Sequence, residues 1–113
     1  MSPREARLYL SDILQACADI RAFTRGMTSA DDLTEDRRTM HAVIRNLEII
    51  GEAARQMPKS VKEMHPEIPW LDIGDMRNVI AHQYFGVDLD IVWDIVRTQI
   101  PDLADQVKKI RTG

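Results

Sequence analysis

The sequence predicts an all-α protein: an antiparallel bundle of four principal helices with short extra helices, folded as one domain over residues 1–113. Three observations support this fold class. Apolar residues recur at three- and four-residue steps over most of the chain. No segment alternates apolar and polar residues as a half-buried strand would. A length of 113 residues is typical of a single domain.

The first helix is expected to begin at Pro3, because Ser2 and Glu5 form a Ser-x-x-Glu capping box and proline suits the first helical position. Gly26 is expected to end it. Residues 27–34 are small and polar, which predicts a connecting loop. The apolar stripe of this helix consists of Leu10, Ile13, Leu14, Cys17, Ile20 and Phe23.

A second long helix is predicted from Thr34 to Met57, where Pro58 stops it. A short helix is expected over residues 59–64, and the prolines within 66–69 then impose an extended crossing. The buried face of the long helix is expected to hold Met40, Val43, Ile44, Leu47, Ile50, Ala54 and Met57.

A third helix is expected to begin at one of the aspartates of residues 72–75 and to end near Tyr84. A fourth should begin at Asp88 or Asp90. Pro101 interrupts the fourth helix although the apolar spacing continues beyond it, so we expect a kink or a short break and then a last helix.

Composition excludes several classes of protein. The formal net charge of −3 and the pI near 5.5 do not suit a generally basic nucleic-acid-binding surface or a polybasic membrane binder. Cys17 is the single cysteine, so the chain can form neither an internal disulfide nor a cysteine-based zinc site. No apolar run is long enough to span a membrane, and the N-terminal residues do not resemble a signal peptide. We therefore expect a cytoplasmic protein.

Charge is unevenly distributed along the chain. Six basic residues face two acidic ones between Arg37 and Lys62, a local charge of +4, and five aspartates face one arginine between Gly86 and Asp105, a local charge of −4. One interpretation is two solvated faces. The alternative is a basic surface that meets phosphate beside an acidic surface that meets another partner.

The segment 77–84, Arg-Asn-Val-Ile-Ala-His-Gln-Tyr, holds the densest group of chemically active residue types. Arginine offers a fork of donors that matches a phosphate, and histidine can move a proton near neutral pH. Asn78 and His82 are four residues apart on a helix, so the amide can orient the imidazole. These groups suffice to cleave a phosphodiester without a metal ion. The alternative is that Arg77 and His82 are ordinary surface or interface residues.

The other histidines and glycines suggest no further site. His41 and His65 lack the paired spacing of a di-iron or zinc centre, so we expect no metal site. Gly51 and Gly74 are isolated and form no phosphate-binding loop, and Gly51 is expected to be a helix-packing contact.

The pattern Arg77-Asn78-x-x-x-His82-x-Tyr84 resembles the R-x-x-x-x-H-x-Y signature of HEPN-domain ribonucleases, and specifically that of the HepT toxins of toxin–antitoxin pairs. Further segments are similar to that family in the same order, so the resemblance covers nearly the whole chain. These segments are residues 45–54 (RNLEIIGEAA), 66–70 (PEIPW), 76–78 (MRN) and 92–93 (VW).

The resemblance implies a HEPN-type bundle that homodimerises and cleaves RNA without metal or cofactor. It also implies a partner, a minimal nucleotidyltransferase resembling MntA, that acts as the antitoxin of a type VII-like pair. By position, Tyr84 is the residue that such a partner modifies with AMP, and the added phosphate would occupy the Arg77 fork. The alternative for Tyr84 is a packing aromatic with a satisfied hydroxyl.

In this interpretation His82 abstracts the 2′-hydroxyl proton or protonates the leaving 5′-oxygen, Arg77 stabilises the phosphorane, and Asn78 holds His82. Arg77 and His82 lie about 140° apart around an ideal helix, which favours a two-fold dimer with a composite site. We expect its axis near the third helix and residues 86–93.

The acidic net charge predicts a small basic cleft rather than a long basic track, and hence a short or single-stranded RNA site such as a tRNA loop or end. Candidate RNA-binding residues beside Arg77 are Arg45, Arg55 and Lys59. The acidic C-terminal third is a candidate surface for docking the antitoxin. Two alternatives remain at this point: a non-catalytic HEPN module that binds nucleotide and supports a nucleotidyltransferase, and a purely structural dimerisation domain.

Overall fold

The computed structural model describes residues 3–82 and 88–110, with the side chains of residues 6–76 and 88–110. This part of the chain is helical and contains no strand, which confirms the predicted all-α class. The helical elements are α1 (Pro3–Phe23), α2 (Ala30–Glu35), α3 (Arg37–Gln56), α4 (Lys59–Met64), α5 (Trp70–His82), α6 (Leu89–Asp94), the π-helical turn η2 (Ile95–Gln99) and α7 (Ile100–Lys108).

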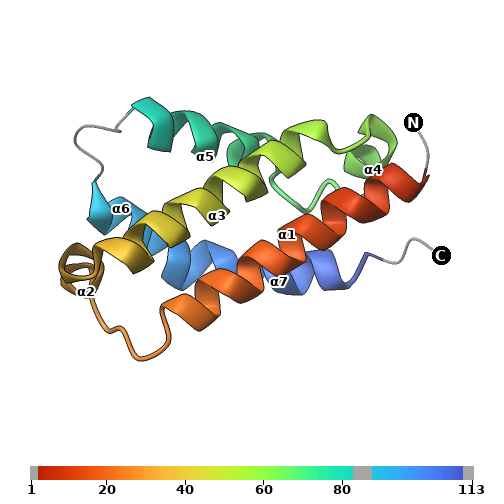
Figure 1. Ribbon diagram of the computed structural model, residues 1–113. Coiled ribbons are helices and arrows are strands. Elements are labelled where there is room, and N and C mark those ends of the chain that lie inside the picture. The colour runs from red at the N-terminus through yellow and green to blue at the C-terminus, as the bar shows by residue number, and fades with distance from the viewer. Residues whose placement is uncertain (1–2, 83–87, 111–113) are drawn as a thin grey trace.

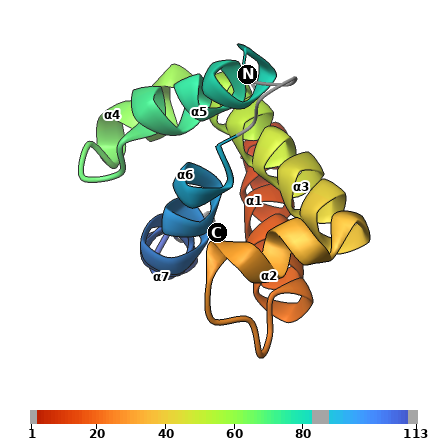
Figure 2. The ribbon, with the colours of Figure 1, turned by 90° about the vertical axis from the view of Figure 1, so that its left-hand side faces the viewer.

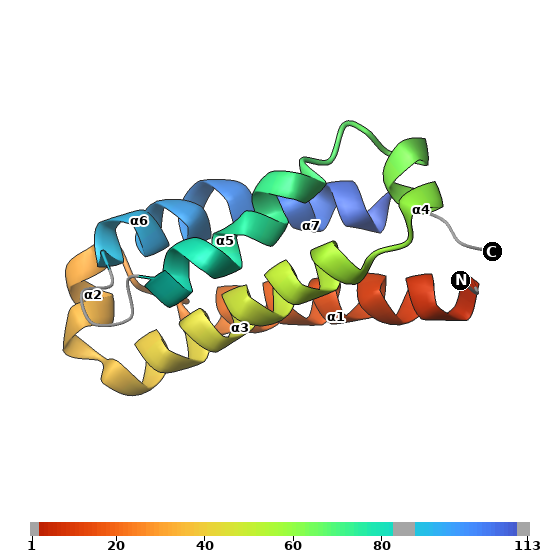
Figure 3. The same ribbon diagram turned by 90° about the horizontal axis from the view of Figure 1, so that it is seen from above.

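Four long helical units form the bundle. Helices α1 and α3 lie side by side and antiparallel, α5 packs on α3, and α7 packs on α1 (Figure 1). The units appear in end view in Figure 2, where α6 and α7 form one continuous arm facing α5. Helix α2 closes one end of the bundle against α6, and α4 lies at the other end, near the two termini (Figure 3).

The core runs the length of this bundle and is apolar throughout. Among the described side chains, no polar or charged residue is buried. No helix in the described part is long and apolar enough to cross a membrane. The largest fully buried side chains are Ile13, Ile20, Leu33, Leu47, Ile50, Ile68, Ile100, Val43, Val107 and Cys17.

The prediction of a loop over residues 27–34 is wrong for its second half, because α2 begins at Ala30. Ser29 and Asp32 form a capping box at its start, and Leu33 is fully buried beneath it. The next helix begins at Arg37 rather than Thr34. Asp36 caps it by accepting a hydrogen bond from the Thr39 backbone N–H at 3.0 Å, so the chain turns before it re-enters a helix.

Two later boundaries also differ from the prediction. Helix α5 begins at Trp70, two residues before the earlier of the two aspartates expected to start it, while Asp88 is confirmed as the cap of α6. In place of the kink or short break expected at Pro101, the structure has the wide turn η2, and the expected last helix follows as α7. Proline lacks the N–H that an α-helical bond to Arg97 requires, and a π turn relaxes that requirement. The predicted end near Tyr84 lies outside the described residues.

Candidate active site

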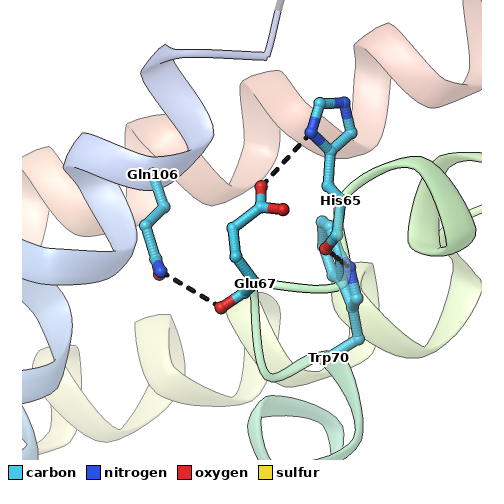
Figure 4. Close-up of polar contacts among 4 residues, drawn as sticks. All are labelled: His65, Glu67, Trp70 and Gln106. Carbon is cyan, nitrogen blue, oxygen red and sulfur yellow. Dashed lines mark hydrogen bonds and ion pairs between the residues drawn. The ribbon is translucent and has the colours of Figure 1, made fainter.

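Helix α5 carries the sequence motif, and the segment before it is held by side-chain hydrogen bonds (Figure 4). The indole Nε1 of Trp70 donates to the carbonyl oxygen of His65 at 3.0 Å. The amide Nε2 of Gln106, on α7, donates to the carbonyl oxygen of Glu67 at 3.3 Å. Because one bond closes the loop on itself and the other ties it to α7, the start of α5 is held in place relative to α7.

Burial of apolar side chains also holds the start of α5 in place. Ile68 and Trp70 are 2 % and 7 % exposed, and Ile73 and Met76 continue the buried face of α5. Burying a side chain of this size stabilises the fold by about 1.5–3 kcal/mol. The first two turns of α5 are therefore well packed, and they set the position of the motif that follows.

The backbones of Arg77, Asn78 and His82 lie in the last two turns of α5. Their side chains, and the whole of Tyr84, lie outside the described part of the structure. Their arrangement as a catalytic group therefore stays a prediction. Around an ideal helix, all three positions fall within roughly 80° of Gly74, and Arg77 also follows Ile73 by one turn on a neighbouring stripe of α5.

Gly74 is a point of close approach between α5 and α3. A Cβ atom at this position would lie 2.7 Å from Cγ and 3.6 Å from Cδ of Arg55, and 3.9 Å from the carbonyl oxygen of Gly51. Gly74 is buried, whereas Arg55 is exposed. The aliphatic stem of Arg55 therefore lies across α5 at Gly74, one helical turn before the motif.

The other two basic candidates lie elsewhere. Arg45 forms an ion pair with Glu48 at 3.5 Å and lines a small pocket between α1 and α3. Lys59, on α4, pairs with Glu63 at 3.8 Å. Among the three candidates, Arg55 is the one that the structure brings against α5; roles in RNA binding for Arg45 and Lys59 stay predictions.

A groove of about 750 Å³ lies on the side of α5 opposite Gly74, between α5 and the arm formed by α6, η2 and α7. Its lining includes the apolar side chains of Ile73, Met76 and Ile91. No lysine or arginine is among its described lining residues, and the described side chains contain no group of three that could hold a metal ion. Five carboxylates line it: Glu67, Asp72, Asp75, Asp94 and Asp102. We call this feature the acidic groove.

Sequence reasoning found only half of this groove. It identified the excess of aspartates after Gly86, but it used Asp72 and Asp75 only as helix-start signals. It also treated Gly74 as an isolated glycine. A glycine inside a helix costs roughly 0.5–1 kcal/mol relative to alanine, and that cost is the signal that points to a close contact here.

His65 and Cys17 have chemically reactive side chains but lie apart from the motif on α5. His65 Nδ1 is 3.3 Å from Glu67 Oε2, in the loop before α5. Cys17 is buried in the core, and burial raises the pKa of its thiol to about 11. A thiol with that pKa is protonated at neutral pH, so Cys17 is no nucleophile.

A family profile described as ribonuclease HepT-like matches residues 13–110. The chain belongs to the HepT-like ribonuclease family. It is 44 % identical over 108 residues to a protein of Thermococcus cleftensis named "Probable ribonuclease HepT", a match that covers 96 % of this chain and 97 % of that one. A protein of Caldanaerobacter subterraneus named "Putative RNase" is 41 % identical over 104 residues, 92 % of each chain. No solved structure matches.

This membership agrees with the resemblance of the motif and supports nuclease activity for this HepT-like chain. A protein of Methanocaldococcus jannaschii, also named "Putative RNase", is 37 % identical over 110 residues, which cover 97 % of this chain and 90 % of that protein. The similarity therefore extends over the whole bundle and is not confined to α5.

Proposed function

We propose that this HepT-like protein is a metal-independent endoribonuclease that acts as the toxin of a toxin–antitoxin pair. The observation that carries the proposal is the position of Arg77, Asn78 and His82 in the last two turns of a helix whose start is anchored. These residue types supply a phosphate-binding fork, an orienting amide and a proton-transfer group. Membership of a ribonuclease family supports the same assignment.

The proposed reaction is a transesterification within the RNA backbone. The 2′-oxygen attacks the adjacent phosphorus as its proton passes to a base, and the bond from phosphorus to the 5′-oxygen breaks as that oxygen gains a proton. His82 serves as base or acid, and Arg77 stabilises the charge on the phosphorane. The products are a 2′,3′-cyclic phosphate and a 5′-hydroxyl end. DNA lacks the attacking hydroxyl and should resist.

A two-fold homodimer completes this site in the proposal. Arg77 and His82 are five residues apart, which separates them by about 140° around the helix and about 7.5 Å along it. One copy therefore presents the two groups in different directions, whereas two copies about an axis near α5 supply an acid, a base and two arginine forks to one cleft.

The first experiment is a cleavage assay on purified protein with a labelled single-stranded RNA. His82→Ala should reduce the rate by on the order of 10²–10⁴. His41→Ala, at an exposed position on α3, is the matched control and should cleave like the wild type. Equal rates for His82→Ala and wild type, or loss of wild-type activity in EDTA, would show that this mechanism is wrong.

The regulatory part of the proposal concerns Tyr84 and a partner nucleotidyltransferase. AMP attached to Tyr84 would bring a phosphate to the end of α5, where it would compete with RNA for Arg77. The acidic groove supports a docking role for this side of the molecule, because its apolar lining and five carboxylates suit a protein surface that carries lysines or arginines. The same carboxylates would repel RNA.

Intact mass after co-expression with the candidate antitoxin tests the modification. The wild type should gain whole AMP units, and Tyr84→Phe should gain none while still cutting RNA. The chain has two tyrosines, so Tyr9→Phe is the complete control and should keep the added mass. Added mass that persists in Tyr84→Phe would assign the modification to another residue.

A further inference from the structure

We infer that Arg55 is an RNA-contacting residue of the ribonuclease site and that Gly74 is the residue that positions it. Gly74 leaves room for the Arg55 stem, so the guanidinium is directed along α5 to bind a phosphate next to the one that is cleaved. This inference rests on the proposed ribonuclease function and adds to it a binding residue from a second helix.

The stem of Arg55 is in close contact with Gly74. With Cγ of Arg55 only 2.7 Å from where a Gly74 Cβ would stand, the stem occupies the space that any side chain at position 74 would need. Gly51 lies one turn before Arg55 on the same face of α3, and its carbonyl oxygen approaches the same point. Gly51 and Gly74 thus mark a close crossing of α3 and α5, and the stem of Arg55 lies over this crossing.

The direction of the Arg55 side chain follows from the geometry of the two helices. Side chains in a helix lean toward its N-terminus, and α3 and α5 run antiparallel (Figure 1). An α3 side chain that lies on α5 therefore leans toward the C-terminal end of α5, which carries the motif. Arg77 and Asn78 follow Gly74 by about 4.5 Å and 6 Å along the helix axis, on the same side of α5.

The charges around Arg55 suit a phosphate ligand. Arg55 takes part in none of the three ion pairs found among the described residues, whereas Arg45 and Lys59 each pair with a glutamate. Lys62 reinforces the positive charge beside it, since its Nζ donates to the carbonyl oxygen of Arg55 at 3.4 Å. An exposed guanidinium on the side of α5 away from the acidic groove suits a phosphate, which it can bind through two parallel hydrogen bonds.

Binding of a fluorescein-labelled single-stranded RNA of mixed sequence, followed by anisotropy in a His82→Ala background, tests this inference. Arg55→Gln should weaken binding roughly threefold to tenfold and lower the slope of log affinity against log salt by about 0.7, the value for one phosphate contact. Arg7→Gln removes the same charge from an exposed position on α1, beside α7 and away from α5, and is the matched control. Equal losses in the two variants would overturn the inference.

Gly74→Ala separates positioning from charge. Alanine favours the helix and leaves the net charge unchanged, yet its Cβ must displace the Arg55 stem. Gly74→Ala should therefore weaken RNA binding when Arg55 is present and have no further effect when Arg55 is already replaced by glutamine. An equal loss in both backgrounds would assign Gly74 to helix packing alone and overturn its positioning role. A wild type that cuts no RNA would refute the proposed function instead.

Discussion

The buried thiol of Cys17 predicts a specific loss of stability at alkaline pH. The side chain is 1 % exposed within the core on α1. Burial raises its pKa from 9.0 to about 11, and the positive charges of Arg21 and Lys108 offset only part of that rise. The folded protein therefore holds the thiol proton over a pH range in which the unfolded chain releases it.

The size of the effect follows from these two values. Between pH 9 and about 11 the unfolded state binds fewer protons than the folded state, so the free energy of unfolding falls as the pH rises. Each pKa unit corresponds to about 1.4 kcal/mol, so the two-unit difference should remove roughly 2–3 kcal/mol. Below pH 9 this contribution is fully present, and by pH 11 it is largely lost.

Urea denaturation of wild type and Cys17→Ala, followed by circular dichroism across this pH range, measures the effect. Alanine removes the titrating group and leaves a small cavity, whose cost does not depend on pH. The stability advantage of the wild type over Cys17→Ala should therefore shrink by roughly 2–3 kcal/mol between pH 9 and 11. A constant advantage would refute the reasoning, because it would mean that the thiol ionises equally in both states.

Three further predictions concern stability and assembly. Leu33→Ala should cost about 2–5 kcal/mol in urea denaturation, because Leu33 is the one buried residue of α2, whereas the exposed Thr34→Ala should cost far less; equal costs would contradict the anchoring of α2. Trp70→Phe should cost about 0.5–1.5 kcal/mol by removing the indole donor to the carbonyl of His65, which keeps only the Ile68 N–H, and an unchanged urea midpoint would argue against the indole bond. Light scattering should give a dimer of twice the 13.0 kDa chain, and a mass near 13.0 kDa would refute the dimer.

The long helices were predictable because each carries its own signals. A regular apolar stripe marks both α1 and α3, Gly26 and Pro58 follow their last turns, and the short helix α4 follows Pro58 directly as expected. Helix α2 was missed because Leu33 is its only buried side chain, so no periodicity exists over six residues. At Pro101 the sequence predicted a kink or a short break and then a last helix, but not the wide turn η2, because the burial of Ile95, Val96 and Ile100 that keeps the chain helical is a tertiary effect.

The motif could be placed on a helix from local spacing alone, because helical positions four and five residues apart need no tertiary information, and the backbone of residues 77–82 is helical as expected. The catalytic roles of Arg77, Asn78 and His82 and the role of Tyr84 stay predictions. The contact between Arg55 and Gly74 joins residues on two helices, and the acidic groove joins Asp72 and Asp75 to a distant arm of the chain. Such pairs depend on how helices cross, which no local pattern in one sequence determines.

The two sides of α5 have a consequence for how the protein can be silenced. A protein bound in the acidic groove and an RNA phosphate bound by Arg55 would lie on opposite sides of α5 at Gly74, so neither needs to displace the other at that point. Such a partner would therefore leave the Arg55 contact with RNA in place. Inhibition by a partner in the acidic groove would then have to act on the last turns of α5, which continue the side of the helix that lines the groove, and not on the contact between Arg55 and RNA.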